Sequence, residues 1–352
     1  MFLAPLGDWY DGGIGLVTVE YHDNLAFVQS DPALGALLSA PSAQAPFDRI
    51  DWWQGLASMC NLQPLVAVAR DGDDCAVLPF CRGDGELAAL ANWYSFRWRP
   101  IVSPGCDPAP LLVALAAALK EKCKRIVLAP LTDECGEATA LEAAFRTAGW
   151  SLWREACDTN HVLPVNGRSF DAYLAGRPGH LRTTLKRKAP RINCFILERF
   201  DEEAWNAWEA IYRDSWKPSE GSPAFLRAFA EAEARAGRMR LGMAFADGMP
   251  IAGQLWTVEA GTAFIHKLAH RETARDLSPG TVLSAALFRQ VIDRDRVALI
   301  DFGTGDDAYK RNWMESQRPR YRLTMLRPGV PGNWPLLARR TLARLAAAAK
   351  RG

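Results

Sequence analysis

The sequence lacks a long hydrophobic run, an early basic residue and any Cys-x-x-Cys pair. Its most apolar stretch, residues 110–119, stops at Lys120, well short of the roughly 18 to 20 residues that span a membrane. No Lys or Arg precedes Arg49, so we expect no secretory signal peptide and no membrane insertion. The eight cysteines lack the spacing of metal ligands, and we therefore expect reduced thiols, no metal and a cytoplasmic location.

Two motifs are also missing. Neither a Walker A motif nor a Gly-x-Gly-x-x-Gly motif occurs, which disfavours nucleoside triphosphate and dinucleotide sites. What is present, 352 residues of which 49% are hydrophobic, suffices for one large core or two cores of about 150 residues each. The aromatic content of 10% excludes a disordered, collagen-like or coiled-coil chain.

The same order of predicted elements occurs twice. Two strands joined by an Asp-Gly turn and a third strand precede a helix, a strand, a helix and a last strand. In the first half these elements are expected at 64–69, 75–80, 86–94, 109–122, 125–129, 137–148 and from 150 onward. In the second half they are expected at 239–245, 250–258, 262–270, 281–293, 297–302, 306–314 and 320–326. We interpret this as duplication of one α/β unit, while a chance order of common elements remains the alternative.

Further helices are predicted outside the repeats. They begin after Ser169 and continue at 181–189, 201–216 and 223–236, and a basic, Ala-rich helix follows at 334–350. We therefore expect a first unit at 1–165, a second unit at 166–328 and a basic C-terminal helix at 329–352.

A loop before the helix at 281–293 could hold a phosphate. Ser278, Pro279, Gly280 and Thr281 precede or open this helix, whose first backbone N–H groups and dipole favour an anion. Gly280 would let a ligand approach the backbone closely. An ordinary capped turn is the alternative.

A second group of polar residues follows the strand at 297–302. Asp306, Asp307, Tyr309 and Lys310 would lie at the carboxyl edge of the sheet, where open α/β folds bind ligands. Alternatively, the two carboxylates only favour the start of a helix.

Two more segments offer polar side chains next to apolar ones. In the strand 262–270, alternation places His266 and Leu268 on one face and Lys267 on the other. A buried histidine with a hydrogen-bond partner is the alternative to a catalytic one. Trp216 and Lys217, at a predicted helix end, could line a pocket or simply form a turn.

The segment 177–191 is basic. Arg182 and Lys186 would be neighbours on a helix and could bind a phosphate, although a solvated face explains them equally. Aromatic residues are not interleaved with these charges, so we expect no nucleic acid partner.

The order of these motifs resembles one family, the GNAT-type acetyltransferases grouped with bacterial cellulose-biosynthesis (CelD/BcsL-like) proteins. The resemblance extends over roughly residues 165 to 325, and the first half is similar to the degenerate partner unit of a tandem GNAT protein related to Fem-type transferases. It is carried by Ser169 to Arg191, Ser215-Trp216-Lys217, Asp247-Gly248, Leu277-Ser278-Pro279-Gly280-Thr281 and Gly305-Asp306-Asp307-Ala308-Tyr309-Lys310-Arg311-Asn312-Trp313.

The resemblance implies an α/β (α+β) fold of tandem units, each a mixed, mostly antiparallel sheet flanked by helices. It implies acetyl-CoA or another acyl-CoA as cofactor, bound through an Arg/Gln-x-x-Gly-x-Gly/Ala loop. Arg275, Ser278 and Gly280 take the marked positions of that loop, with Ser278 in place of a glycine. Lys267 and Leu268 would lie on the strand that pairs with pantetheine.

The resemblance also implies direct acyl transfer to an amine or hydroxyl. His266 is the first candidate for the general base, followed by Asp306 or Asp307, and Tyr309 is the candidate acid. Lys310 would bind the cofactor or an acceptor phosphate. The acceptor, a sugar, polysaccharide precursor or small metabolite, would contact Arg182, Lys186, Trp216 and Lys217.

Two other functions are open. A Fem-type enzyme would take its donor from aminoacyl-tRNA, and only then would a nucleic acid be a partner. A polysaccharide-operon accessory protein without catalysis would use the basic C-terminal helix to bind a membrane surface.

Overall fold

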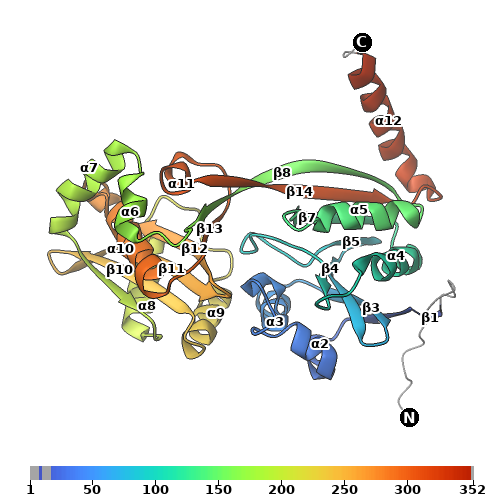
Figure 1. Cartoon of the computed structure of the whole chain (residues 1–352), viewed down its shortest axis with the longest axis horizontal. Coiled ribbons are helices and arrows are strands. Elements are labelled where there is room, and N and C mark those ends of the chain that lie inside the picture. Colours follow the sequence, from blue (N-terminus) through green and yellow to red (C-terminus); the bar gives the residue numbers. More distant parts are fainter. Residues whose placement is uncertain (1–7, 10–16, 350–352) are drawn as a thin grey trace. The chain divides into compact units, whose positions relative to one another are not determined.

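The computed structural model describes residues 8–9 and 17–349, and in this part the chain forms two compact units (Figure 1). Unit 1 contains residues up to 43, 47–157 and those from 319 onward. Unit 2 contains residues 44–46 and 158–318. The chain therefore passes from unit 1 to unit 2 and then returns to unit 1 for its last segment.

Unit 1 is a mostly antiparallel sheet with the strand order β1-β2-β3-β4-β5-β7-β14, in which only β5 and β7 are parallel. Helices pack against it around a core that includes Leu115, Ile126 and Leu323. Its elements are β1 (Asp8–Trp9), β2 (Thr18–His22), α1 (Leu25–Ser30), α2 (Pro32–Leu37), α3 (Ile50–Met59), β3 (Pro64–Asp71), β4 (Asp74–Arg82), β5 (Glu86–Ala89), β6 (Ile101–Val102), α4 (Pro108–Ala118), β7 (Arg125–Leu131), α5 (Glu137–Thr147), the first half of β8 (Ser151–Pro164), most of β14 (Ser316–Leu326) and α12 (Trp334–Ala349).

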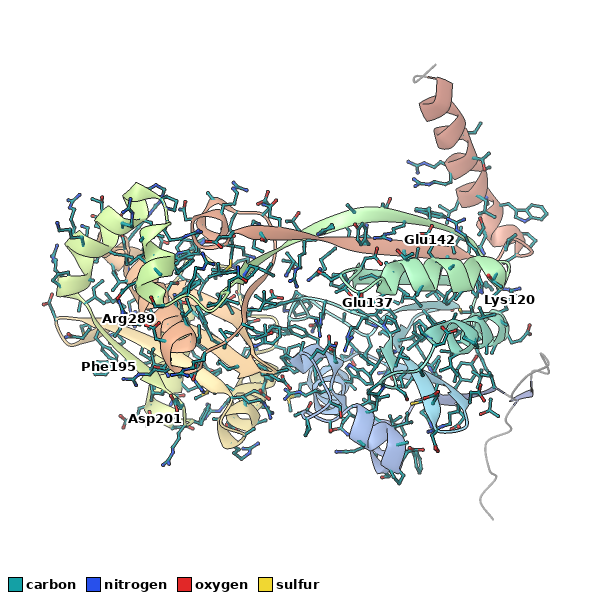
Figure 2. All side chains as sticks on the ribbon, in the orientation of Figure 1. Lys120, Glu137, Glu142, Phe195, Asp201 and Arg289 are labelled. Carbon is teal, nitrogen blue, oxygen red and sulfur yellow. The ribbon has the colours of Figure 1, made fainter. Side chains whose placement is uncertain are left out.

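Unit 2 has the strand order β8-β13-β12-β11-β10-β9, again with one parallel pair, β12 and β13. Asp201 caps its helix α8 by accepting a hydrogen bond from the backbone N–H of Ala204 (Figure 2). Besides the second half of β8, its elements are α6 (Phe170–Ala175), α7 (Gly179–Lys188), β9 (Asn193–Leu197), α8 (Glu202–Arg213), α9 (Pro223–Arg235), β10 (Met239–Ala246), β11 (Met249–Glu259), β12 (Thr262–His270), η4 (Glu272–Leu277), α10 (Pro279–Arg289), β13 (Leu299–Thr304) and α11 (Ala308–Trp313).

Helices cover both faces of the unit 2 sheet. Gly242 of β10 lies against Leu283 and Leu287 of α10, whereas Gly253 of β11 lies against Trp208 of α8. The register pairs Met243 with Gly253, so Gly242 and Gly253 lie on opposite faces. We call these the α10 face and the α8 face.

The predicted fold class and the order of elements in both repeats are confirmed. Three details differ. The strand expected at 86–94 ends at Ala89, and the helix expected at 281–293 is an α-helix over 279–289 followed by a π-helical turn at 290–294. Residues 18–59, 101–102 and 193–197, for which no element was predicted, contain β2 and α1 to α3, β6 and β9, respectively. The predicted C-terminal helix is present as α12, and its expected last residue, Lys350, lies outside the described residues.

The last strand of each repeat extends into the unit of the other repeat. Residues 160–164 of β8 pair with β13 in unit 2, and residues 321–326 of β14 pair with β7 in unit 1. The division of the chain into 1–165, 166–328 and 329–352 stays a prediction. In the described part of the chain, no helix is long and apolar enough to cross a bilayer.

Candidate functional site

The parallel strands β12 and β13 separate toward their carboxyl ends. Their pairing runs from Thr262, opposite Leu299, to Phe264, opposite Asp301, and within the described residues goes no further. Beyond this point β13 continues to Thr304, which pairs with β8 instead. The second half of β12 therefore has one edge that β13 does not cover, and its backbone groups can pair with an extended ligand.

His266 is the extra residue of a β-bulge in β12. Pairing with β11 jumps from Leu255–Lys267 to Trp256–Ile265, so His266 has no opposite residue. The bulge turns His266 and Lys267 to the same face, which corrects the expected alternation that placed His266 beside Leu268. Bulges of this kind are frequent next to active sites.

Both side chains of the bulge have partners on the α8 face. Nε2 of His266 lies 2.8 Å from the hydroxyl of the buried Thr257, and its ring centroid lies 5.0 Å from that of Phe229 in α9. Nζ of Lys267 pairs with Glu220 at 2.7 Å. Leu268, in contrast, packs against the core of the α10 face.

The amino-terminal end of α10 has no side-chain cap. Ser278 precedes the helix with φ +53° and ψ +47°, and its hydroxyl makes no capping hydrogen bond. The carbonyl of Gly280 accepts hydrogen bonds from Nε2 of Gln254 and from the hydroxyl of Tyr309, each at 3.0 Å. The helix start is thus braced from inside the protein. Ser278 and Thr281 donate their backbone N–H groups to the carbonyls of Arg275 and Ser278, and Pro279 has no N–H, so the N–H of Gly280 is the donor of this loop that bonds to no backbone carbonyl in the described residues.

Two aromatic rings lie beside this helix start. The ring of His270, to which no role was assigned from the sequence, lies 4.4 Å from the Trp216 ring. A Cβ placed on Gly280 would lie 3.7 Å from Nδ1 of His270. Burial lowers the pKa of His270 below its ordinary value, which favours a neutral imidazole here. Arg275 is exposed in the preceding turn.

The carboxylates at the start of α11 are both engaged. Asp306 lies 3.0 Å from Nε2 of His161, and hydrogen bonds from Arg311 and His161 lower its pKa. Asp307 caps α11 by accepting the backbone N–H of Lys310 at 2.9 Å. These contacts favour the interpretation of the two residues as structural, because a carboxylate that is already paired is a weak base.

Tyr309 is half-buried next to the start of α10. Its hydroxyl donates to Gly280 and lies 2.9 Å from the hydroxyl of Ser284. Burial raises the pKa of Tyr309 to about 12, so the phenol stays protonated at neutral pH.

Three lysines, Lys217, Lys267 and Lys310, lie close enough for their charges to interact. Lys310 is 9% exposed and donates to the carbonyls of Gly303 and Thr304. Burial lowers the pKa of Lys310 below its ordinary value. Burial, with the positive charges of Lys267 and Lys310, lowers the pKa of Lys217 to about 8. Lys217 therefore loses its proton more easily than an ordinary lysine.

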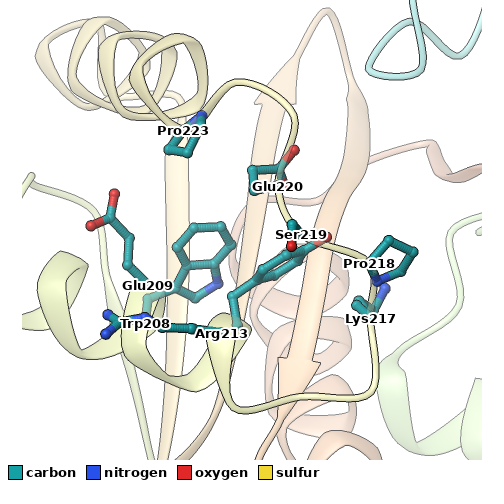
Figure 3. A pocket seen from close by; sticks show the side chains of 9 residues that line it. Trp208, Glu209, Arg213, Lys217, Pro218, Ser219, Glu220 and Pro223 are labelled. Carbon is teal, nitrogen blue, oxygen red and sulfur yellow. The ribbon is translucent and has the colours of Figure 1, made fainter.

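A pocket opens next to Lys217, between α8 and the loop that leads to α9 (Figure 3). We call it the α8–α9 pocket, and its volume is about 270 Å³. Trp208 on its wall is 2% exposed, and its indole N–H has no hydrogen-bond partner in the described part of the protein. The lining residues are Trp208, Glu209, Tyr212, Arg213, Lys217, Pro218, Ser219, Glu220 and Pro223.

Arg182 and Lys186 do not line this pocket. Both are exposed on α7, whose buried residues Leu181 and Leu185 face the core of the α10 face. The pocket is on the opposite face, next to α8. A role of the two basic residues in acceptor binding stays a prediction.

Comparison with known proteins identifies the class of this fold. Residues 179–311, within unit 2, match the family model described as acetyltransferase (GNAT) domain. This match includes the bulge, the start of α10 and the start of α11. No curated protein matches the chain.

Solved structures share this fold over most of the chain. The crystal structure of FemX is 12% identical, with a TM-score of 0.56 over 86% of this chain and 96% of its own. A tandem GNAT protein from the clavulanic acid biosynthesis pathway is 14% identical, with a TM-score of 0.52 over 87% and 98%. L-PGS from Bacillus licheniformis is 14% identical, with a TM-score of 0.50 over 75% and 85%. At these identities the likeness establishes the fold alone.

Sequence reasoning missed the walls of the α8–α9 pocket. The sequence predicts a helix at 201–216, which contains Trp208 and Tyr212, but assigns these two residues to no pocket. Their spacing of one helical turn is the same for a core face and for a pocket wall, so periodicity could not separate the two. Glu220, which pairs with Lys267, lies in a loop whose conformation no local pattern predicts.

Proposed function

We propose that unit 2 transfers an acyl group from acetyl-CoA or another acyl-CoA to an amine or hydroxyl of a sugar, polysaccharide precursor or small metabolite. The observation that supports this best is the uncapped start of α10 beside the uncovered edge of β12. An uncapped helix start suits a diphosphate, and a free strand edge suits the amide groups of pantetheine. We further propose a CelD/BcsL-like relationship and a cytoplasmic location, on the order of motifs over 165–325.

The residues of unit 2 fit such a cofactor. The backbone N–H of Gly280 and the dipole of α10 would hold the diphosphate, with Arg275 as an exposed cation nearby, and Lys267 and Leu268 lie on the strand edge. Acyl-CoA, when bound, supplies an activated thioester. Backbone N–H groups of the bulged strand would stabilise negative charge on the acyl oxygen.

Tyr309 is the proposed acid. Its raised pKa keeps the proton on the phenol, and its position below Gly280 is next to the proposed cofactor loop. Among the bases predicted from the sequence, Asp306 and Asp307 are engaged by other groups, and His266 is held by Thr257.

The test of the proposed function is a calorimetric titration with acetyl-CoA, comparing Gly280→Ala with the wild type. A methyl group fits the protein at Gly280, since the nearest atoms lie 3.7 and 4.0 Å away, but it occupies the space a diphosphate needs. We expect affinity to fall about tenfold or more, or about 1.4 kcal/mol, with stability unchanged.

Gly179→Ala is the matched control. Gly179 also lies in the first turn of a helix and has no atom within 4 Å of its Cβ position, so its variant should bind acetyl-CoA like the wild type. No binding to the wild type, or equal losses in both variants, would contradict the proposal. Thermal stabilisation by aminoacyl-tRNA instead of acetyl-CoA would favour the Fem-type alternative.

A further inference from the structure

The α8–α9 pocket has the features of a site for a polar acceptor. Trp208 and Tyr212 form an aromatic wall, their ring centroids 5.6 Å apart. Carboxylates and cations also line the pocket, which suits a small molecule with several polar groups.

Lys217 connects this pocket with the uncovered edge of β12. It lines the pocket, and its neighbour Trp216 contacts His270 at the start of α10. Lys217 is therefore placed between the proposed acceptor site and the proposed cofactor site. Lys217 interacts electrostatically with charged or titratable groups on three elements. These are Lys267 and His270 of β12, Lys310 of α11 with its capping residue Asp307, and Glu220 of the same loop as Lys217.

The balance of these charges makes Lys217 easier to deprotonate than an ordinary lysine. Glu220 is already paired with Lys267, and Asp307 with the backbone of α11, so neither is free to hold the lysine proton alone. Burial and two further ammonium groups oppose a third positive charge. A lysine in this state can accept a proton near neutral pH, as general bases require.

We propose that Lys217 is the base of the transfer and that the acceptor binds in the α8–α9 pocket. This inference rests on the proposed acyl transfer. The neutral Nζ takes the proton of the acceptor nitrogen or oxygen while that atom bonds to the acyl carbon. The carbon–sulfur bond then breaks, Tyr309 protonates the leaving sulfur, and the proton held by Lys217 restores the phenol through solvent.

The first test measures the titration of Lys217 in the full chain. Trace deuterated acetic anhydride is reacted from pH 6 to 11, and peptide mass spectrometry follows each lysine. We expect Lys217 to be half-reactive near pH 8, and Lys120 of unit 1 (Figure 2) is followed as the reference lysine. Lys267→Met should move the Lys217 midpoint upward, because a positive neighbour is removed, while Lys120→Met should not. An ordinary midpoint for Lys217 would overturn the inference.

The second test asks whether Lys217 lies next to bound acetyl-CoA without being needed to bind it. Saturating acetyl-CoA should reduce labelling of Lys217 several-fold and leave Lys120 unchanged. In calorimetry, Lys217→Met should bind acetyl-CoA within about threefold of the wild type. Binding of acetyl-CoA without protection of Lys217, or loss of binding in Lys217→Met, would overturn the inference and leave the proposed function intact. Failure of the wild type to bind acetyl-CoA would instead reject the proposed function.

Discussion

Ser278 adopts a left-handed backbone conformation where η4 ends and α10 begins. Such a φ is unfavourable for any residue with a Cβ, and the resembling family has glycine at this position. We expect Ser278→Gly to raise the free energy of unfolding by about 0.5 to 1 kcal/mol, measured by urea denaturation. The variant should also retain acetyl-CoA binding, because the backbone that would hold the diphosphate keeps its conformation.

Ala260→Gly is the control for this prediction. Ala260 has φ +46° in the turn between β11 and β12, so its variant should be stabilised by a similar amount. A loss of stability in Ser278→Gly alone would mean that the serine side chain stabilises the loop, contrary to the prediction.

Tyr309 carries a second prediction at the scale of single residues. Tyr309→Phe removes the donor to Gly280, whose carbonyl keeps its bond from Gln254, so α10 should remain in place. We expect kcat to fall about tenfold or more, within the usual range for loss of an acid, with the acetyl-CoA Kd nearly unchanged. Steady-state kinetics with an acceptor from a screen of amino sugars, together with calorimetry, would measure this, and an unchanged kcat would exclude Tyr309 as the acid.

The pH dependence of the wild type belongs with this prediction. The pKa of Tyr309 lies near 12, so its deprotonation should not reduce kcat below about pH 11. The pKa of Lys217 is lowered to about 8, and the neutral form increases above this value. Activity should therefore rise through pH 8 if Lys217 is the base, and a pH profile without a rise near pH 8 would exclude this role.

At the scale of elements, unit 1 contains a parallel strand pair, β5 and β7, that corresponds to β12 and β13 of unit 2. In unit 1, however, another chain segment pairs with β7 beyond the point where β5 ends. Pairing of β5 with β7 stops at Ala88, opposite Val127. Beyond it, Trp98 pairs with Leu131 of β7, and its backbone N–H donates to the carbonyl of Pro130 at 2.6 Å. The buried indole of Trp98 donates to Pro79. A chain segment of unit 1 thus takes the place that is uncovered in unit 2.

The helix of unit 1 that corresponds to α10 is also capped. Asp107 accepts the backbone N–H of Ala109 at the start of α4, and its negative charge would repel a diphosphate. We therefore expect one acetyl-CoA per chain in calorimetry. Asp107→Ala should lower the free energy of unfolding by about 1 kcal/mol without a change in that number. A stoichiometry of two would show that unit 1 binds as well.

The elements of the two repeats could be predicted because their signals are local. Asp71-Gly72 and Asp247-Gly248 mark hairpins, and Gly149 and Gly237 follow helices. The bulge at His266 could not be predicted in this way, because it depends on the register between β11 and β12. The same holds for the segment at Trp98, whose pairing with β7 is non-local.

At the scale of the whole molecule, the exchange of last strands links the two repeats. Each parallel pair is flanked by an antiparallel strand that the chain supplies from the other repeat, β14 next to β7 and β8 next to β13. Hydrophobic periodicity indicates that a strand exists but not which strand it pairs with. The sequence therefore assigned all of β8 to the first repeat and predicted a boundary at 165. Pairing in the folded chain follows spatial neighbours instead.

This exchange predicts which fragments fold. A fragment of residues 158–318 keeps β8 beside β13, with the buried Val162 and Leu163, whereas a fragment of 166–328 loses them. At about 1.5 to 3 kcal/mol for each buried aliphatic side chain, this loss is comparable to the stability of a domain. The fragment 166–328 also carries Leu323 and Met325 near its end. In the full chain these two residues are buried in the core of unit 1, so the fragment would expose them.

We therefore expect 158–318 to unfold cooperatively in urea and 166–328 to be unfolded or aggregated, as followed by circular dichroism and size-exclusion chromatography. The two fragments have nearly the same length and share residues 166–318, so a difference between them reports on the exchanged strands and not on size. If 166–328 unfolded as cooperatively as 158–318, β8 would be dispensable for unit 2, and the repeats would be separate domains that merely exchange an edge.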